Sequence, residues 1–449
     1  MSVVFDISRL ISRARFDTPT GIDRFELSYA NWATARFDNT IRFVANSFFG
    51  PRQIPREFAH TLLADTTAKW NAGDSASGQA ALLERLVAAI ERRSDWTGTR
   101  HPDVQATHGR GNDLLNAIGS LLWNPSAIPS SSLFVHVSHS RLHQPAAYDW
   151  LARRDCKPLF YVHDLIPLLR PEFCRTGEAA RHRTRIQTIL RLHKMILCNS
   201  QATARTLDEM AAADGLPQPF TAVLPPGLEN SFLRVDARTS LRTTHPYFVC
   251  LGTIEPRKNH ALLLEIWRQL ASRYGTRSPR LVVVGRRGWD NTHVFSLLSD
   301  RDAFRGSVIE VAGLNDHSTA RLLGGASALL APSHIEGYGM PVAEALALGT
   351  PVIASDIRAH REVSRGRAVL LDTLDGVGWM SAIEAHARCP RRNDHVEQRH
   401  WTWPAHFDAL HRLLASAGLA PVIERETAAV ATAHAWPGRL AGTNSCQVM

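Results

Sequence analysis

Two glutamates, Glu336 and Glu344, stand eight positions apart in the stretch HIEGYGMPVAEALALGTPVIASD, residues 334–356. The apolar run ALLAPS precedes them, and glycines and Pro341 lie between them. Proline fits the first turn of a helix, because its missing N–H has no acceptor there. The stretch therefore predicts a buried strand, a loop carrying Glu336, and a helix carrying Glu344 in its first turn, with both carboxylates facing one crevice. A glutamate that only stabilises the helix dipole is the alternative interpretation.

A second motif supports the prediction of a ligand-binding crevice. The stretch GTIEPRKNH, residues 252–260, also follows an apolar run, and its Arg257 and Lys258 precede another expected helix. A guanidinium fork and an ammonium group at this position can neutralise a departing nucleoside diphosphate. An exposed basic turn is the alternative for a single Arg-Lys pair. A third loop, GRRGW at 285–289, would bring further positive charge or a base-stacking ring, or is plain surface.

The elements that must position these motifs alternate regularly along the chain. Continuously apolar runs separated by amphipathic segments predict parallel sheets covered on both faces, and therefore two Rossmann-like, doubly wound α/β domains. In the second half the expected strands are 247–252, 280–285, 307–313, 328–333 and 350–356. In the first half, where the pattern is looser, they are 2–8, 40–47, 132–138, 158–164, 194–200 and 220–227.

Domain boundaries follow from the same pattern. Residues 1–240 are assigned to the N-terminal domain and 245–400 to the C-terminal domain, with a polar junction near 235–246. Residues 51–130 fit the alternation poorly and are interpreted as an insertion or irregular element around a helix. A closing helix is expected at 401–418, and a poorly ordered tail at 420–449.

Composition narrows the class of partner. The formal net charge of +9 favours nucleotides, diphosphates or an anionic membrane face as partners. Nucleic acid is a weaker candidate, because the sequence shows no basic motif interleaved with aromatic residues. The six cysteines contain no CxxC pair, so neither a zinc site nor a disulfide framework is expected. No apolar run approaches the roughly 18 residues of a membrane span, and the N-terminus is typical of a first strand rather than of a signal peptide. We therefore expect a cytoplasmic protein.

These motifs resemble those of a known family. EGYGMPVAE resembles the E-x7-E motif of family 4 glycosyltransferases, and IEPRKN is similar to their phosphate-binding Arg-Lys motif. The resemblance is strong over 247–360 and implies the GT-B fold, with two Rossmann-like domains facing a central cleft. In the first half, TGIDRFELSYA resembles the family's glycine loop, and YVHDLIPLLRPEF resembles a segment of bacterial mannosyltransferase-like members. CNSQATARTL and LPPGLENSF resemble the SxxT and P-x-G segments.

The resemblance also implies roles for single residues. Glu336 would contact hydroxyls of the transferred sugar, and Glu344 would hold the donor ribose. Arg257 and Lys258 would bind the diphosphate, and His163 would reach the sugar from the other domain. Asp164 would orient either that histidine or a loop backbone. Further contacts with the donor would come from Gly21, Gly339, Met340, Pro341 and Val342.

The implied reaction is a retaining transfer of a hexose to a hydroxyl of a glycan or lipid-linked oligosaccharide in bacterial polysaccharide biosynthesis (exopolysaccharide, O-antigen or capsule). GDP-mannose is the first choice of donor. No carboxylate nucleophile is implied, and no metal or other cofactor is expected, because the chain has no metal-bridging DxD motif. Arg257→Ala or Glu336→Ala is expected to abolish transfer and to leave the fold intact.

Several alternatives remain open. A nucleotide-sugar epimerase with the GT-B fold would convert the donor without an acceptor, and a non-catalytic subunit would only bind the sugar nucleotide. His139, in the strand-end loop HVSHSRL, would face donor or acceptor or play no part. The basic stretch 181–194 either contacts the inner face of the membrane or forms a solvated helix face.

Overall fold

The apolar runs of the first half of the chain pair as one sheet. In this computed structural model the described residues are 1–16, 19–47, 50–72, 76–92, 95–96, 128–233, 241–300, 302–388 and 401–420. Within them the N-terminal sheet has seven strands in the order β3-β2-β1-β4-β5-β6-β7. All neighbours are parallel except β2 and β3, which are antiparallel. The strands are β1 (Val3–Asp6), β2 (Ile41–Ser47), β3 (Gly50–Ile54), β4 (Leu133–His136), β5 (Lys157–Val162), β6 (Met195–Cys198) and β7 (Thr221–Val223).

The second half forms a separate parallel sheet. Its six strands within the described residues run in the order β10-β9-β8-β11-β12-β13. They are β8 (Tyr247–Leu251), β9 (Arg280–Val284), β10 (Val308–Val311), β11 (Ala328–Ala331), β12 (Val352–Ser355) and β13 (Val369–Leu371). The prediction of two doubly wound α/β domains is confirmed, because helices cover both faces of the sheets and explain their continuously apolar strands.

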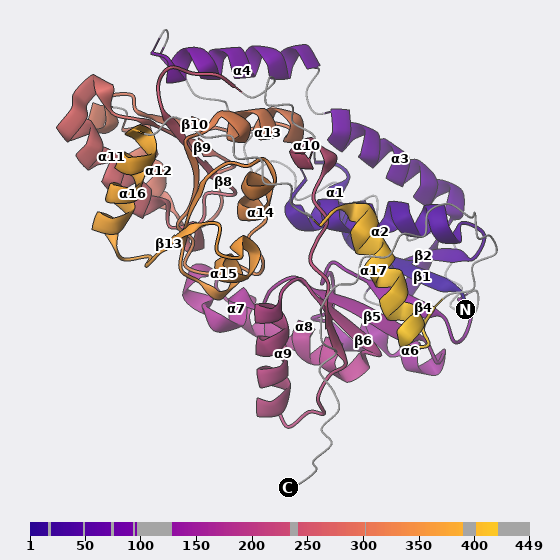
Figure 1. The fold of residues 1–449 in the computed structure, drawn as a ribbon. Helices are drawn as coiled ribbons and strands as arrows, with labels where there is room; N and C mark the ends of the chain where they lie inside the picture. The colour runs from indigo at the N-terminus through magenta and orange to yellow at the C-terminus, as the bar shows by residue number, and fades with distance from the viewer. Residues whose placement is uncertain are drawn as a thin grey trace, which may run out of the picture.

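The helices of the two halves pack mainly on their own sheets (Figure 1). In the first half they are α1 (Ser8–Arg13), α2 (Gly21–Phe37), α3 (Arg56–Ala72), α4 (Ala76–Ile90), α6 (Trp150–Arg153), α7 (Ile166–Leu169), α8 (Glu178–Leu192), α9 (Gln201–Ala213) and α10 (Asn230–Leu233). In the second half they are α11 (His260–Tyr274), α12 (Thr292–Ser299), α13 (Asp316–Gly325), α14 (Met340–Ala347), α15 (Arg358–Ser364), α16 (Gly376–Arg388) and α17 (Trp403–Ser416).

Of the irregular element expected at 51–130 around a helix, the structure has the helix, α4, but its other described residues are more regular than expected. Strand β3 and helices α3 and α4 are regular, while 97–127 lies outside the described residues. Helix α4 packs on the core of the C-terminal domain through residues such as Leu86 and Ile90, and lies over that domain in Figure 1. Its apolar positions recur at helical spacing, but sequence spacing does not indicate which domain they face.

Helix α17 is the reverse case of α4. It follows the C-terminal domain in sequence but packs beside α2 on the N-terminal domain (Figure 1). Its His406 bonds the Tyr29 hydroxyl at 2.8 Å and the backbone oxygen of Pro225 at 2.7 Å. The expected tail at 420–449 lies outside the described residues apart from Ala420. No helix in the described ranges has the length and apolarity needed to cross a bilayer.

Candidate active site

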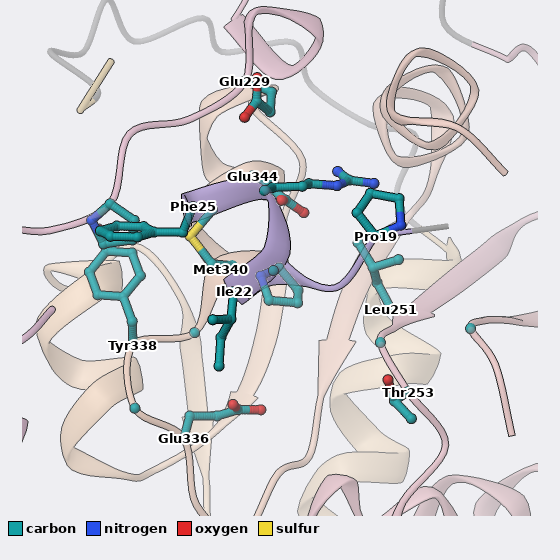
Figure 2. Close-up of a pocket in the computed structure, with 18 of the residues that line it drawn as sticks. Pro19, Ile22, Phe25, Glu229, Leu251, Thr253, Glu336, Tyr338, Met340 and Glu344 are labelled. Atoms are coloured by element: carbon teal, nitrogen blue, oxygen red, sulfur yellow. The ribbon is translucent and has the colours of Figure 1, made fainter. Parts of the chain in front are cut away.

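A cavity of about 450 Å³ lies between the two sheets. Its walls come from segments that follow the carboxyl ends of strands in both domains, which is where open α/β sheets bind ligands. The sequence-predicted residues that line it are Gly21, His163, Arg257, Lys258, Glu336, Gly339, Met340, Pro341 and Glu344. Figure 2 shows Glu336 and Glu344 at opposite sides, with Ile22 and Met340 between them. The structure therefore brings the predicted acids and cations into one cleft.

Val342 is the exception. Its side chain is fully buried in the core of the C-terminal domain, and it does not line this cavity. Its N–H donates to the backbone oxygen of Gly339 at 3.0 Å, so it is not one of the donors left over at the start of the helix. With 3.6 residues per turn, residues two positions apart lie on roughly opposite sides of a helix, so Val342 is turned inward when Met340 faces the cleft.

Glu336 is the centre of a buried ionic cluster. Lys258 Nζ donates to its Oε1 at 2.6 Å, and Arg257 Nη1 donates to its Oε2 at 2.7 Å. Ser333 Oγ also donates to Oε1, at 2.8 Å. Burial by itself would raise the pKa of Glu336, but Arg257 and Lys258 outweigh burial and hold that pKa well below its usual range. The carboxylate is therefore ionised and fixed in place.

A second acid balances the cluster. Arg257 Nε lies 2.6 Å from Oε1 of Glu255, whose pKa is raised by burial although Arg257 and Lys258 oppose the shift. Two acids thus face two cations. Donor capacity is left over, because a guanidinium has five N–H donors and an ammonium has three. The two cations can consequently donate hydrogen bonds to the oxygens of a diphosphate without first breaking their own ion pairs.

The start of α14 adds further donors. Gly339 caps this helix with φ +97°, a left-handed conformation that favours glycine, and Pro341 lies in the first turn. Within the described residues, the backbone N–H groups of Gly339 and Met340 have no hydrogen-bond acceptor. They lie at the positive end of the helix dipole, which suits an anion. Glu344 is the fifth residue of α14, so it lies in the second turn. The sequence had predicted the first turn.

Glu344 lies in a different electrostatic environment from Glu336. Burial raises its pKa to about 8, helped by nearby Asp316 and opposed by Arg24. Arg24 of α2 forms an ion pair with Asp316 of α13 and thereby joins the two domains across the cleft. Glu229 lies beyond Glu344 in Figure 2 and accepts a hydrogen bond from Trp403 Nε1 at 2.9 Å. An acidic cluster with one arginine therefore forms the end of the cleft away from Glu336.

The N-terminal domain closes the cleft with α2 and the loop after β5. Gly21 is the first residue of α2, whose N-cap Thr20 forms a capping box with Asp23. A Cβ at Gly21 would meet no atom within 4 Å, so ligand space is open beside it. His163 Nε2 lies 2.6 Å from the backbone oxygen of Val137, which fixes the proton on Nε2 and leaves Nδ1 unprotonated. Burial lowers the pKa of His163 to about 4.

Asp164, His139 and the third loop, for which the sequence left alternatives open, differ in their relation to the cavity. Asp164 Oδ1 accepts the N–H of Ile166 at 3.1 Å and thus orients the loop backbone. His139 packs its ring 5.5 Å from that of His163 but does not line the cavity. From the third loop, Gly285 and Arg286 line the cavity, whereas Arg287 turns away to pair with Glu310 and Trp289 lies under Arg175.

Sequence reasoning missed part of the cleft. The polar and aromatic lining residues that were not singled out include Arg24, Phe25, Asn199, Glu229, Asp316, Tyr338 and Trp403. For Glu229 and Asp316 a signal existed, because both are acids in segments that follow strands at the carboxyl edge of a sheet. Trp403 gave no such signal, since only the return of α17 to the N-terminal domain brings it there.

Two facing Rossmann-like domains with a ligand cleft between them define the GT-B architecture. Among solved structures, Anabaena Alr3699/HepE in complex with UDP is similar over 93% of this chain and 100% of its own, with a TM-score of 0.56 and 14% sequence identity. The same protein is known with UDP and glucose and with UDP-glucose. This likeness shows the fold.

The sequence comparisons show which family part of the chain is similar to. Residues 234–369 match the model of the family "Glycosyl transferases group 1". The serotype-specific mannosyltransferase WbdA of Escherichia coli is 25% identical over 266 residues, 54% of this chain and 31% of WbdA. The E. coli O-antigen chain mannosyltransferase B is 31% identical over 140 residues, 31% of this chain and 35% of that protein. A D-inositol 3-phosphate glycosyltransferase of Gordonia bronchialis is 29% identical over 294 residues, 61% of this chain and 64% of that protein.

The chain is therefore similar over residues 234–369 to the glycosyltransferases of group 1, the family that its motifs resemble. It spans about a third of the length of the first two relatives and about two thirds of the third.

Proposed function

We propose that this protein is a retaining glycosyltransferase that moves a hexose from a nucleoside diphosphate sugar to a hydroxyl of a glycan or lipid-linked oligosaccharide in bacterial polysaccharide biosynthesis. Mannose from GDP-mannose is the first choice, because two of the relatives reported above are named mannosyltransferases. The observation that carries the proposal is the Arg257–Glu336–Lys258 cluster, which lies in the same cleft as Glu344 and the start of α14.

The donor would span the cleft from one acid to the other. Its diphosphate would lie against Arg257, Lys258 and the N–H groups that begin α14. A carboxylate has about four lone-pair positions, and three of those on Glu336 are used by protein donors. One position is left to accept a sugar hydroxyl, and Glu344 would hold the ribose at the other end.

Transfer would depend on stabilising the leaving group. The bond from the anomeric carbon to the diphosphate oxygen breaks, and a bond to the acceptor oxygen forms on the same face of the sugar. The acceptor proton passes to the departing phosphate oxygen. Arg257 and Lys258 neutralise the charge that develops on the diphosphate, which is the largest contribution that fixed donors in a closed site can make. Glu336 is already paired with two cations, so it is a poor nucleophile.

His163 would approach the sugar from the N-terminal domain. With its proton fixed on Nε2, its Nδ1 can accept a hydrogen bond from a sugar hydroxyl. Its low pKa keeps the ring neutral at physiological pH. The ring would therefore orient the sugar without adding a positive charge beside the diphosphate.

A thermal-shift panel of GDP-, UDP-, ADP- and dTDP-sugars tests the donor assignment. A nucleotide sugar present at about 100 times its Kd stabilises the folded state by about 2.7 kcal/mol, enough to raise Tm by several degrees. We expect GDP-mannose to give the largest shift. A panel in which no sugar nucleotide raises Tm would overturn the proposal.

Two further incubations separate the alternatives. Conversion of the donor sugar without an acceptor would indicate an epimerase, and binding without any turnover would indicate a non-catalytic subunit. Treatment with EDTA tests the absence of a metal from the proposed reaction, and we expect it to leave the transfer rate unchanged. The proposed acceptor places the protein on the cytoplasmic side of the membrane, in peripheral contact with it.

A further inference from the structure

One helix of the N-terminal domain is capped by an acid from the other domain. Helix α9 packs against α15 of the C-terminal domain. The N–H groups of Gln201 and Ala202, which open α9, donate to Oε1 and Oε2 of Glu362 on α15 at 2.7 and 3.1 Å. The first N–H groups of a helix lack partners within the helix and carry partial positive charge. Glu362 therefore completes α9 only while the two domains are in contact.

The residue before α9 makes a second link. Ser200 is the N-cap of α9, and its Oγ accepts the N–H of Thr203 at 3.0 Å. The same hydroxyl donates to the backbone oxygen of Gly337 in the C-terminal domain at 2.8 Å. Ser200 is fully buried, so this hydrogen bond is protected from water. The serine thus closes its own helix and holds the loop that carries Glu336.

Gly337 permits this contact because it has no side chain. A Cβ at this position would lie 2.3 Å from the backbone oxygen of His163 and 2.9 Å from Cβ of Asp164. Any larger residue would push the two domains apart. Gly337 directly follows Glu336, so a tight contact between the domains lies beside the two residues assigned to the donor sugar.

We propose that Ser200, Gly337 and Glu362 form a cross-domain latch that sets the separation of Glu336 and His163. Neither Ser200 nor Glu362 lines the cleft, so both act as positioning residues through the loop that carries Glu336. The inference rests on the proposed function in one respect, namely that the transferred sugar lies between Glu336 and His163. It gives a role to the CNSQAT segment, which donor binding alone does not explain.

The test compares Glu362→Ala and Ser200→Ala with the unchanged protein in three measurements. These are the kcat of sugar transfer, the Kd of GDP and UDP by calorimetry, and the radius of gyration by small-angle X-ray scattering. We expect kcat to fall about 10- to 100-fold, since small misplacements of positioned groups have effects of this size. The Kd for the nucleotide is expected to change less than about threefold, because the sugar end of the site is the part displaced. The radius of gyration should increase as the domains separate.

Two further variants control the test. Arg361→Gln removes the neighbouring side chain of α15, which is exposed and pairs with Asp356 in its own domain, and it should change none of the three quantities. Glu362→Gln keeps an oxygen that can accept one of the two N–H groups, so it should recover part of the lost kcat. Melting curves check that each variant is folded.

Unchanged kcat and an unchanged radius of gyration in Glu362→Ala would overturn the latch. If the unchanged protein binds no nucleotide and transfers no sugar, the proposed function fails. The radius of gyration still decides the latch in that case, because scattering needs no substrate.

Discussion

Arg257 and Glu336, 79 positions apart in the chain, are joined in the cleft by a 2.7 Å hydrogen bond from Nη1 to Oε2. The pair shows that the two motifs found in the sequence are one structural unit. The backbone N–H of His334 also donates to the oxygen of Arg257 at 2.8 Å, which ties the two loops together. A residue assigned to the diphosphate therefore holds a residue assigned to the sugar. Predictions for either one must account for the other.

Replacement of Glu336 by glutamine should abolish most of the transfer. The amide keeps the shape of the side chain but loses the charge that both cations share, and it loses one acceptor. We expect kcat/KM to fall at least about 100-fold, as for other preorganised polar groups in active sites. Steady-state kinetics measures this, and Glu265→Gln on the exposed face of α11 is the matched control. Activity close to that of the unchanged protein would remove Glu336 from the site.

Arg257→Ala should affect folding as well as activity. The sequence alone suggested that this variant keeps the fold intact, but Arg257 pairs with two buried acids, Glu255 and Glu336. Removing one partner of a buried ion pair typically lowers the free energy of unfolding by about 3–5 kcal/mol. Urea denaturation at neutral pH measures the loss. Arg268→Ala, at an exposed and solvent-screened pair on α11, should leave stability almost unchanged. Equal stability of the two variants would contradict the ionic cluster.

Stability should depend on pH through Glu344. Burial raises the pKa of Glu344 to about 8 in the folded protein, so the folded state holds a proton that the unfolded chain releases near pH 4.5. The stability from this group is present at low pH and is lost as pH rises toward 8. Glu344→Gln should therefore gain stability over the unchanged protein across this window, by up to about 1.4 kcal/mol per pH unit.

Melting curves at pH 5, 6, 7 and 8 without nucleotide measure this effect. The difference in Tm between Glu344→Gln and the unchanged protein should be smallest at pH 5 and should grow at each step up to pH 8. Glu384→Gln is the control, because the pKa of Glu384 is lowered by its hydrogen bonds with Tyr274 and Arg273. A constant difference in Tm across the series would rule out the raised pKa of Glu344.

Gln79 of α4 should support the nucleotide end of the cleft. Its Nε2 donates to the backbone oxygen of Gly313 at 2.8 Å, and its Oε1 accepts the N–H of Asn315 at 3.1 Å. Gly313 lines the cavity. Gln79→Ala leaves both backbone groups without these partners, so we expect a loss of about 1–3 kcal/mol in stability. The affinity for a nucleoside diphosphate should fall with it. Glu84→Ala, exposed on the same helix, should change neither quantity.

Helix α8 should bind anionic membranes. Its exposed arginines include Arg181, Arg183 and Arg191. Glu178 pairs closely with Arg185 and lies 4.0 Å from Arg181. Each exposed arginine near an anionic surface contributes about 1 kcal/mol. We expect the protein to sediment with vesicles of anionic phospholipid and not with neutral ones, and changing all three arginines to glutamine should abolish this. Equal recovery in the supernatant with both lipids would leave α8 as a solvated face.

The sequence by itself determined much of the fold. Continuously apolar runs such as those that became β9 and β11 can be buried only in a sheet covered on both faces, so the parallel α/β class followed from periodicity. The Arg257–Lys258 turn and the Glu336 loop could be placed at one sheet edge for the same reason, since both follow strands of one parallel sheet. Their direct pairing, and the role of Glu255 beside them, could not be inferred from spacing.

Only the tertiary structure decided which domain each distant segment joins. Helix α4 packs on the C-terminal domain and α17 on the N-terminal one, because an amphipathic face specifies burial but not its partner. The ion pair of Arg24 with Asp316 and the cap of α9 by Glu362 likewise depend on contact between the two domains. The raised pKa of Glu344 also needed the structure, since it results from burial and from acids brought together from distant parts of the chain. Local patterns set the elements and their chemistry, and long-range packing set the environment in which that chemistry acts.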